Sequence, residues 1–172
     1  DGGFSQEAQL SALSNSKLKM SDVQELRRLR EFLDIVVPMN TRQETLSYRG
    51  SSRKVSIVGT THEFIIAKAN ILPETGRFFT KEESEGAKKV IVLGPTIKED
   101  LFGNIDPIGK KMRVGSTTYR VIGVMEEAGG GGFGGPSFDT YAYIPIETSF
   151  KQFDNKTIIE IITKTKSTDN IP

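Results

Sequence analysis

The chain has 172 residues, which is enough for one domain or two small ones. Its 23 Lys and Arg residues nearly balance its 22 Asp and Glu residues, which argues against a nucleic-acid-binding protein, since such proteins carry clustered basic side chains. The absence of cysteine excludes a disulfide framework and thiolate chemistry.

The N-terminal third predicts an irregular start and then one helix. Residues 1–16 are small and polar, and only a weak strand is expected near residues 8–13. Ser21 and Gln24 have the form of a capping box, which predicts a helix with Ser21 as its N-cap. Apolar residues then recur at helical spacing from Val23 to Leu33, so this helix should bury one face.

Two strands and a hairpin are expected next. Residues 34–38 predict a short buried strand that Pro38 stops, because proline cannot donate to a ladder. Alternation of apolar and polar residues in 45–48 and again in 54–57, separated by a turn sequence, predicts an antiparallel hairpin. A short helical turn is expected after Gly59.

Residues 88–124 predict a compact order of strand, helix, turn and hairpin. An apolar run ends in Gly94, an amphipathic segment ends in Gly103, and two alternating strands meet at Gly115-Ser116, which suits a two-residue turn. In that hairpin, Met112 and Val114 should face Tyr119 and Val121. The segment holds no candidate nucleophile, base or metal cluster, so we interpret it as structural.

The remaining elements complete the fold class. Phe78 and Phe79 are expected to fill a core, residues 80–88 to form a solvated loop or helical turn, and residues 126–138 to form a glycine-rich loop. A strand over 141–146, a helix over 147–153 and a last strand over 157–163 follow. Strands outnumber helices without regular alternation, so the class is α+β with a mostly antiparallel mixed sheet.

Nucleotide-binding motifs are weak here. Gly129, Gly131 and Gly134 satisfy G-x-G-x-x-G, but Pro136 and the following strand replace the helix that a dinucleotide site requires. Gly109-Lys110-Lys111 lacks the upstream glycine and the hydroxyl residue of a Walker A sequence. We therefore expect no nucleotide cofactor, and interpret the glycine run as a flexible loop in which Phe133 is a possible partner contact.

No catalytic or metal site is predicted either. His62 is the single histidine, so neither a zinc site nor a Ser-His-Asp triad has the residues it needs. The adjacent carboxylates Glu82-Glu83 and Glu126-Glu127 are not placed to face each other across a cleft. Asp106 precedes a proline in a turn, where a carboxylate accepts backbone hydrogen bonds, and Asn155 begins a chance glycosylation pattern.

Several short motifs in a fixed order carry a family resemblance. They are Gly76-Arg77-Phe78-Phe79, residues 90–94, Leu101-Phe102-Gly103, residues 106–110, residues 121–124 and Tyr143-Ile144-Pro145. In this order and spacing the chain resembles the MacB-type periplasmic core domain of ABC-transporter permeases, a family that includes FtsX-like permeases. Residues 17–60 match more loosely.

The resemblance implies an architecture. Residues 1–50 would form the first part of a porter-like βαβ subdomain, residues 51–155 an inserted β-rich subdomain called Sabre-like, and residues 156–172 a truncated return strand of the porter-like part. Because the segment begins and ends abruptly, we expect it to be cut from a longer protein, with an apolar segment of about 20 residues directly before Asp1 and three after Pro172.

The resemblance also implies a function. The domain would be non-catalytic and would relay ATP-driven motion of transmembrane helices to the periplasm, in efflux or in lipoprotein or peptide transport. It would lie on the outer face of a bacterial inner membrane, anchored by helices outside this segment. Its partners would be a second permease copy, a cytoplasmic ABC ATPase and an adaptor protein. The isolated segment should be monomeric or only weakly dimeric.

Two alternatives stay open. A stand-alone periplasmic ligand-binding module would use the glycine loop with Phe133 and Tyr141 to line its site. A hydrolase is the weaker alternative, and it would have to depend on His62, Glu126 or Asp139.

Overall fold

The computed structural model describes residues 18–29, 33–68, 71–128 and 138–165. The weak strand expected near residues 8–13 lies outside them. Within them, the elements in chain order are α2 (Met20–Arg28), β1 (Leu33–Tyr48), β2 (Ser51–Thr60), α3 (Phe64–Ala67), β3 (Pro73–Gly76), α4 (Lys81–Glu85), β4 (Val90–Leu93), α5 (Pro95–Phe102), β5 (Lys111–Val114), β6 (Thr117–Met125), the 3-10 turn η1 (Phe138–Thr140), β7 (Tyr141–Pro145), α6 (Ile146–Phe153) and β8 (Glu160–Thr165).

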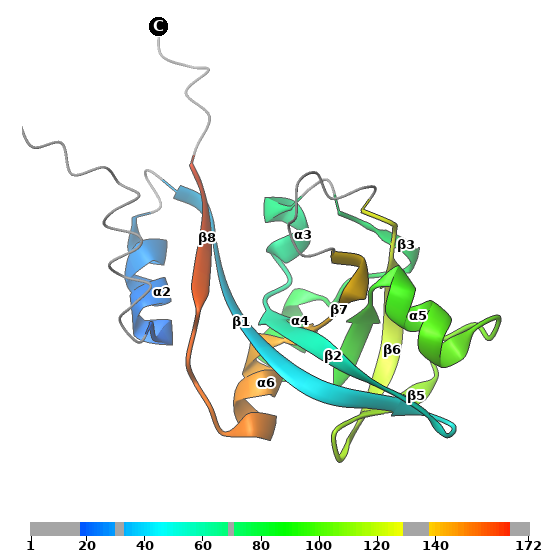
Figure 1. Cartoon of the computed structure of the whole chain (residues 1–172). Coiled ribbons are helices and arrows are strands. Elements are labelled where there is room, and N and C mark those ends of the chain that lie inside the picture. The colour runs from blue at the N-terminus through cyan, green and yellow to red at the C-terminus, as the bar shows by residue number, and fades with distance from the viewer. Residues whose placement is uncertain (1–17, 30–32, 69–70, 129–137, 166–172) are drawn as a thin grey trace, which may run out of the picture.

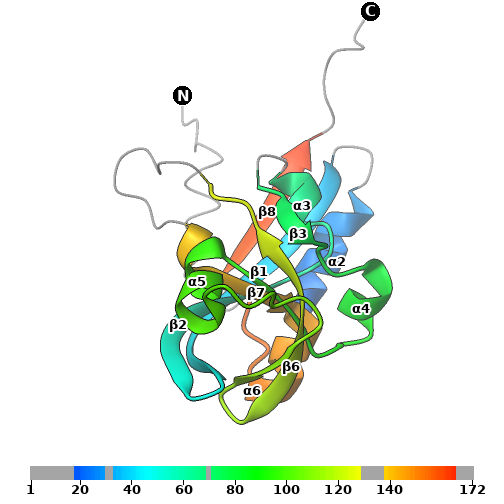
Figure 2. The same cartoon turned by 90° about the vertical axis from the view of Figure 1, so that its right-hand side faces the viewer.

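The strands form one mixed sheet that closes on itself. Its order is β2-β7-β4-β6-β5-β1-β8, and β1 also pairs with β2, so β1, β2, β7, β4, β6 and β5 make a closed barrel (Figures 1 and 2). The β2–β7 and β4–β6 pairs are parallel and the other pairs are antiparallel. The predicted α+β class with a mostly antiparallel mixed sheet is confirmed.

Strand β1 belongs to two structures at once. Its first half, residues 33–39, pairs with β8, while residues 40–48 pair with β2 inside the barrel. Figure 1 shows the β1–β8 ladder with α2 at one side of the molecule and the barrel at the other. We call these two parts the ladder and the barrel.

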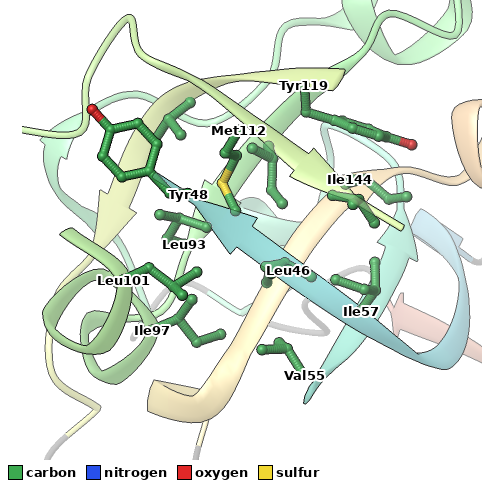
Figure 3. Packing of buried hydrophobic residues seen from close by; sticks show 14 of the residues in the cluster. Leu46, Tyr48, Val55, Ile57, Leu93, Ile97, Leu101, Met112, Tyr119 and Ile144 are labelled. Atoms are coloured by element: carbon green, nitrogen blue, oxygen red, sulfur yellow. The ribbon is translucent and has the colours of Figure 1, made fainter. Parts of the chain in front are cut away.

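The first core fills the inside of the barrel (Figure 3). Every barrel strand contributes buried side chains to it, and α5 adds Ile97, Leu101 and Phe102. Examples are Leu46, Ile57, Leu93, Met112 and Ile144. Helix α5 starts at Pro95 directly after Gly94, as the sequence predicted, because proline is suited to the first position of a helix.

A second core covers the outer face of four barrel strands. Residues that alternate with the inner ones, such as Val58, Val92 and Tyr143, pack against Phe64 of α3 and against Phe78 and Phe79, as predicted for these aromatics. Strands buried on both faces read as continuous apolar runs, which explains the run at residues 90–93.

A third core joins the ladder to the barrel. It holds Val23 of α2, Val36 of β1, and Ile146 and Phe150 of α6, together with Leu18 and Ile158, which form an isolated antiparallel bridge. Val37 and Met39 of the ladder belong to the second core. The ladder is therefore packed on the barrel from both faces of β1.

Several predicted boundaries are wrong. Helix α2 begins at Met20, before the expected N-cap Ser21, because the Asp22 carboxylate accepts a hydrogen bond from the Lys19 backbone N–H at 2.8 Å. Pro38 does not stop a strand: it lies inside β1 where β2 has not yet begun to pair, since the first β1–β2 partners are Asn40 and Gly59.

The hairpins mostly follow the predictions. Arg49 and Gly50 form the β1–β2 turn with φ of 44° and 83°, which is a tighter connection than the expected four residues. Met112 faces Tyr119 across β5–β6 as predicted, but Val114 faces Thr117, so the predicted partner Val121 is wrong. The last strand begins at Glu160, three residues later than the predicted start at Thr157.

Candidate functional site

The predicted candidates for metal or acid–base chemistry do not converge in the described part of the chain. No group of three or more His, Cys, Asp or Glu side chains that could hold a metal ion occurs there. His62 is half-buried, its Nε2 lies 3.8 Å from Glu63, and its Nδ1 is buried without a hydrogen-bond partner among the described residues.

In the Glu82-Glu83 pair, Glu83 has a structural role and Glu82 faces solvent. Glu83 accepts hydrogen bonds from Arg77 at 2.6 Å and from the Thr80 backbone N–H at 3.0 Å, and thereby caps α4. The hydrogen bond from Arg77 and those from Thr80 hold the pKa of Glu83 below its ordinary value, although burial opposes this. Glu82 is exposed.

The other acidic candidates accept hydrogen bonds from backbone N–H groups. Glu126 accepts from the Leu72 N–H at 3.4 Å, and Asp139 accepts from the Ala128 N–H at 2.8 Å. Asp106 accepts from the Ile108 N–H at 3.1 Å, which confirms its predicted turn role. Asn155 makes the same kind of turn with the Thr157 N–H at 3.0 Å.

The glycine motif itself, Gly129, Gly131 and Gly134, lies outside the described residues, as does Phe133. The described segment after it forms the 3-10 turn η1 and then β7. Tyr141, the other residue of the ligand-binding alternative, is half-buried and meets the ring of Phe138 edge-on at 5.9 Å.

Two buried tyrosines lie in the core rather than in a site. The Tyr119 hydroxyl donates to Gln152 Oε1, and Gln152 Nε2 donates to the Val114 carbonyl at 2.9 Å, which ties α6 to the barrel. Burial raises the pKa of Tyr119 and of Tyr143 above the ordinary tyrosine value. Both hydroxyls are therefore protonated at neutral pH.

One surface feature was not predicted from the sequence. An open depression of about 480 Å³ lies between the β1–β2 turn and β5. It is lined by Ser47, Tyr48, Arg49, Gly50, Lys110, Lys111, Met112, Arg113 and Thr118. We call it the basic depression, because four of its lining residues are cationic and none is acidic.

Pairing of β1 with β5 assembles the basic depression. Ser47 is the register partner of Arg113, so the end of β1 lies beside a strand more than 60 residues further along the chain. Tyr48 is 7% exposed, stacks on Phe102 at 4.1 Å between ring centroids, and lies under the Arg49 guanidinium at 5.2 Å. This pairing brings Arg49 into the same depression as Lys110 and Lys111.

In the part of the chain that the structure describes, every helix is too short or too polar to cross a bilayer.

These features define a class: an α+β domain built on a small closed barrel, with cores on both faces of its sheet. Comparison with known proteins identifies the family. The profile of the MacB-like periplasmic core domain matches residues 3–172, and the chain belongs to this family. The resemblance found in the sequence is confirmed.

Curated relatives support the assignment. A macrolide export ATP-binding/permease protein MacB of Chlorobaculum tepidum is 32% identical over 152 residues, which is 87% of this chain and 23% of the relative. The protein of the same name from Marinobacter nauticus is 30% identical over 127 residues, 74% of this chain and 19% of the relative. The chain thus spans about a fifth of the length of these relatives.

Solved structures confirm the fold. The extracellular domain of the noncanonic ABC-type transporter YknZ from Gram-positive bacteria has a TM-score of 0.77 at 22% identity, covering 96% of this chain and 81% of that one. The periplasmic region of MacB from Actinobacillus actinomycetemcomitans has a TM-score of 0.74 at 22% identity, covering 90% and 67%.

Proposed function

We propose that this chain is a non-catalytic extracytoplasmic domain of an ABC-transporter permease, and that it relays movement of membrane-embedded helices to the periplasm. The family and the names of the curated relatives support the permease context. The ATPase would be a separate cytoplasmic domain or subunit. The observation that carries the mechanical part of the proposal is the continuity of β1 between ladder and barrel.

Strand β1 provides a direct mechanical link. It runs for 16 residues without a break, with β8 along its first half and β2 along its second. A load applied to the ladder therefore reaches the barrel through covalent backbone and through ladder hydrogen bonds on both sides of the junction. A flexible linker at this point would absorb such a load instead.

Buried polar contacts reinforce the junction. The Thr60 hydroxyl, fully buried at the end of β2, donates to the Pro38 carbonyl at 3.0 Å. Ser149 of α6 donates to Asn40 Oδ1 at 3.4 Å, and Asn40 is 8% exposed. Because buried polar groups tolerate few alternative arrangements, these contacts favour one fixed orientation of ladder and barrel.

The two-part division remains part of the proposal. Residues 1–50 and 156–172 would be porter-like and residues 51–155 Sabre-like. By this division β1 belongs to the porter-like part while it closes the barrel of the other part, so the two parts share a strand. A shared strand suits a domain that moves as one body.

The surroundings of the domain are proposed from the family. It would sit on the periplasmic face of the inner membrane, anchored by helices outside this segment. A second permease copy, the ABC ATPase and an adaptor protein would be its partners, in efflux or in lipoprotein or peptide transport. The alternative of a stand-alone binding module predicts a signal peptide and a stop codon around this segment, which reading the full gene decides.

The mechanical proposal is tested by softening the junction. Two glycines inserted between Met39 and Asn40 of the full-length permease keep the inside–outside alternation of β1 but interrupt its pairing. We expect loss of transport while the purified transporter still hydrolyses ATP. The matched control inserts two glycines after Ser116, in the exposed β5–β6 turn, and should leave both activities intact.

Two results would count against the proposal. One is normal transport with the junction insertion, once thermal unfolding shows that the domain is folded. The other is loss of ATP hydrolysis together with transport in both insertions, which would indicate a general folding defect rather than a broken mechanical link.

A further inference from the structure

We propose that the basic depression binds an anion of the phosphate class that carries at least two negative charges. This goes beyond force transmission, and nothing in the family assignment implies it. The ligand could be a free phosphorylated solute or the phosphates of a lipid headgroup, because both present the same chemistry to the protein.

The basic depression carries positive charge without acidic partners. Arg49, Lys110, Lys111 and Arg113 line the depression and are all exposed, and no carboxylate lines it. None of them takes part in an ion pair among the described residues, whereas Arg42, Arg53 and Arg77 each pair with an acidic side chain. Four cations gathered without acidic partners create a positive potential that favours a multivalent anion.

Like charges also face each other across the sheet beside the basic depression. Lys111 and Arg120 are direct register partners in the β5–β6 ladder, and both are exposed. Like charges in directly opposed positions destabilise a sheet. An anion bound beside Lys111 would reduce this repulsion. The pair would then destabilise the free protein but not the complex.

The backbone at Arg49 adopts a conformation that is unusual for arginine. This residue has φ of 44°, a conformation in which Asn or Gly is strongly preferred at a two-residue hairpin turn. An arginine here breaks the local rule, which is typical of positions selected for function rather than for folding. Its guanidinium lies over the ring of Tyr48, which holds it at the rim of the depression.

Hydrogen-bond donors complete the site. Ser47 and Thr118 are the register partners of Arg113 on its two sides, and both line the depression. Phosphate oxygens accept hydrogen bonds from such hydroxyl groups and from the neighbouring guanidinium and ammonium groups.

Figure 1 places this site away from the ladder. The β1–β2 hairpin and β5 lie at the opposite side of the molecule from α2 and β8. A ligand bound there would therefore not contact the ladder.

The test titrates the 172-residue chain with inorganic pyrophosphate at low ionic strength. We expect amide NMR shifts concentrated at residues 47–50, 110–113 and 118, and weaker binding as salt screens the charges. The double variant K111Q/R113Q should weaken pyrophosphate binding about tenfold or more, as expected when a charge-assisted hydrogen bond is lost. The control R28Q/K156Q removes the same net charge from exposed positions elsewhere and should bind like the unaltered chain.

A third variant separates binding from folding. R49N places the preferred residue in the hairpin turn, so its melting temperature should be unchanged or higher while its affinity falls. Vesicles that contain cardiolipin, whose headgroup carries two phosphates, distinguish the two sources of phosphate. Sedimentation with these vesicles that pyrophosphate reverses indicates a headgroup, and pyrophosphate binding without vesicle binding indicates a solute.

Either of these two outcomes supports the site. Equal weakening by K111Q/R113Q and R28Q/K156Q overturns it, because binding would then follow net charge alone. The proposal is also overturned if the unaltered chain binds neither pyrophosphate nor the vesicles.

Discussion

The substitution G59A tests the junction between ladder and barrel. Gly59 is the register partner of Asn40, and a Cβ built on it would collide with Asn40 Oδ1 and would lie 3.2 Å from the Ser149 Cβ. Gly59 is not in a left-handed conformation, so alanine is excluded by contact and not by its backbone.

The expected cost follows from three terms. Overpacking a buried contact costs about 1–3 kcal/mol, and losing the Ser149–Asn40 hydrogen bond adds about 1 kcal/mol. Replacing glycine by alanine returns about 0.5 kcal/mol through the unfolded chain. We therefore expect G59A to lower the free energy of unfolding by about 1.5–3.5 kcal/mol, which corresponds to about 3–14 °C in melting temperature for a domain of this size.

The assay is a double-mutant cycle in urea, followed by circular dichroism. In the N40A background the colliding amide is absent, so G59A should cost less than about 1 kcal/mol, giving a coupling of about 1–2 kcal/mol. If G59A costs the same in both backgrounds, Asn40 is not the contact that fixes this junction and the reasoning is refuted.

Three further predictions concern the cores and the titrating groups. I57A should cost about 2–5 kcal/mol and I57V about 0.5–1.5 kcal/mol in urea unfolding, since Ile57 is 1% exposed inside the barrel; equal costs would mean that the barrel interior is loosely packed. Arg77 lowers the pKa of Glu83, so the pair contributes to the free energy of unfolding, by about 1 kcal/mol at most because it is partly exposed. This contribution is present above the unfolded pKa of Glu83 and is lost as pH falls through its folded pKa. In a plot of stability against pH, E83Q should flatten the fall on the acid side and R77K should not, and an unchanged acid side in both variants would contradict the pairing. Burial raises the pKa of Tyr119 and Tyr143, so the stability that depends on them is full below the ordinary tyrosine pKa and falls as pH rises through the folded values. An absorbance titration should therefore show at least two of the four tyrosines ionising late, and ionisation of all four at the ordinary pH in the folded chain would contradict the burial of these two.

Local signals in the sequence were sufficient for most elements. Gly94 with Pro95 marks the start of α5, and Gly115 marks the β5–β6 turn, because these residues fix backbone direction on their own. The buried aromatics Phe78 and Phe79 were equally predictable from their place after a turn.

Closure of the barrel was not predictable from local signals. It depends on the parallel pairs β2–β7 and β4–β6, which join segments far apart in the chain. Pro38 misled the prediction for the same reason: whether a proline interrupts a ladder depends on which neighbours need its missing N–H, and β2 starts to pair only at Asn40.

The basic depression shows the same limit for a candidate site. Arg49 and the cations of residues 110–113 meet only through the pairing of Ser47 with Arg113. A local signal did exist, because an arginine in a two-residue hairpin turn is unexpected, but the sequence alone suggested a longer turn there.

The absence of cysteine makes the central claim directly measurable, since introduced cysteines are then the only labelling sites in this domain. Spin labels at R28C on α2 and K54C on β2, both exposed, report the distance between ladder and barrel in the full-length permease. If the domain transmits force as one body, the distance distribution measured by pulsed electron resonance stays single and unchanged between the nucleotide-free and ATP-trapped states. A distribution that shifts or splits on ATP binding would show that ladder and barrel move against each other, and would contradict the account.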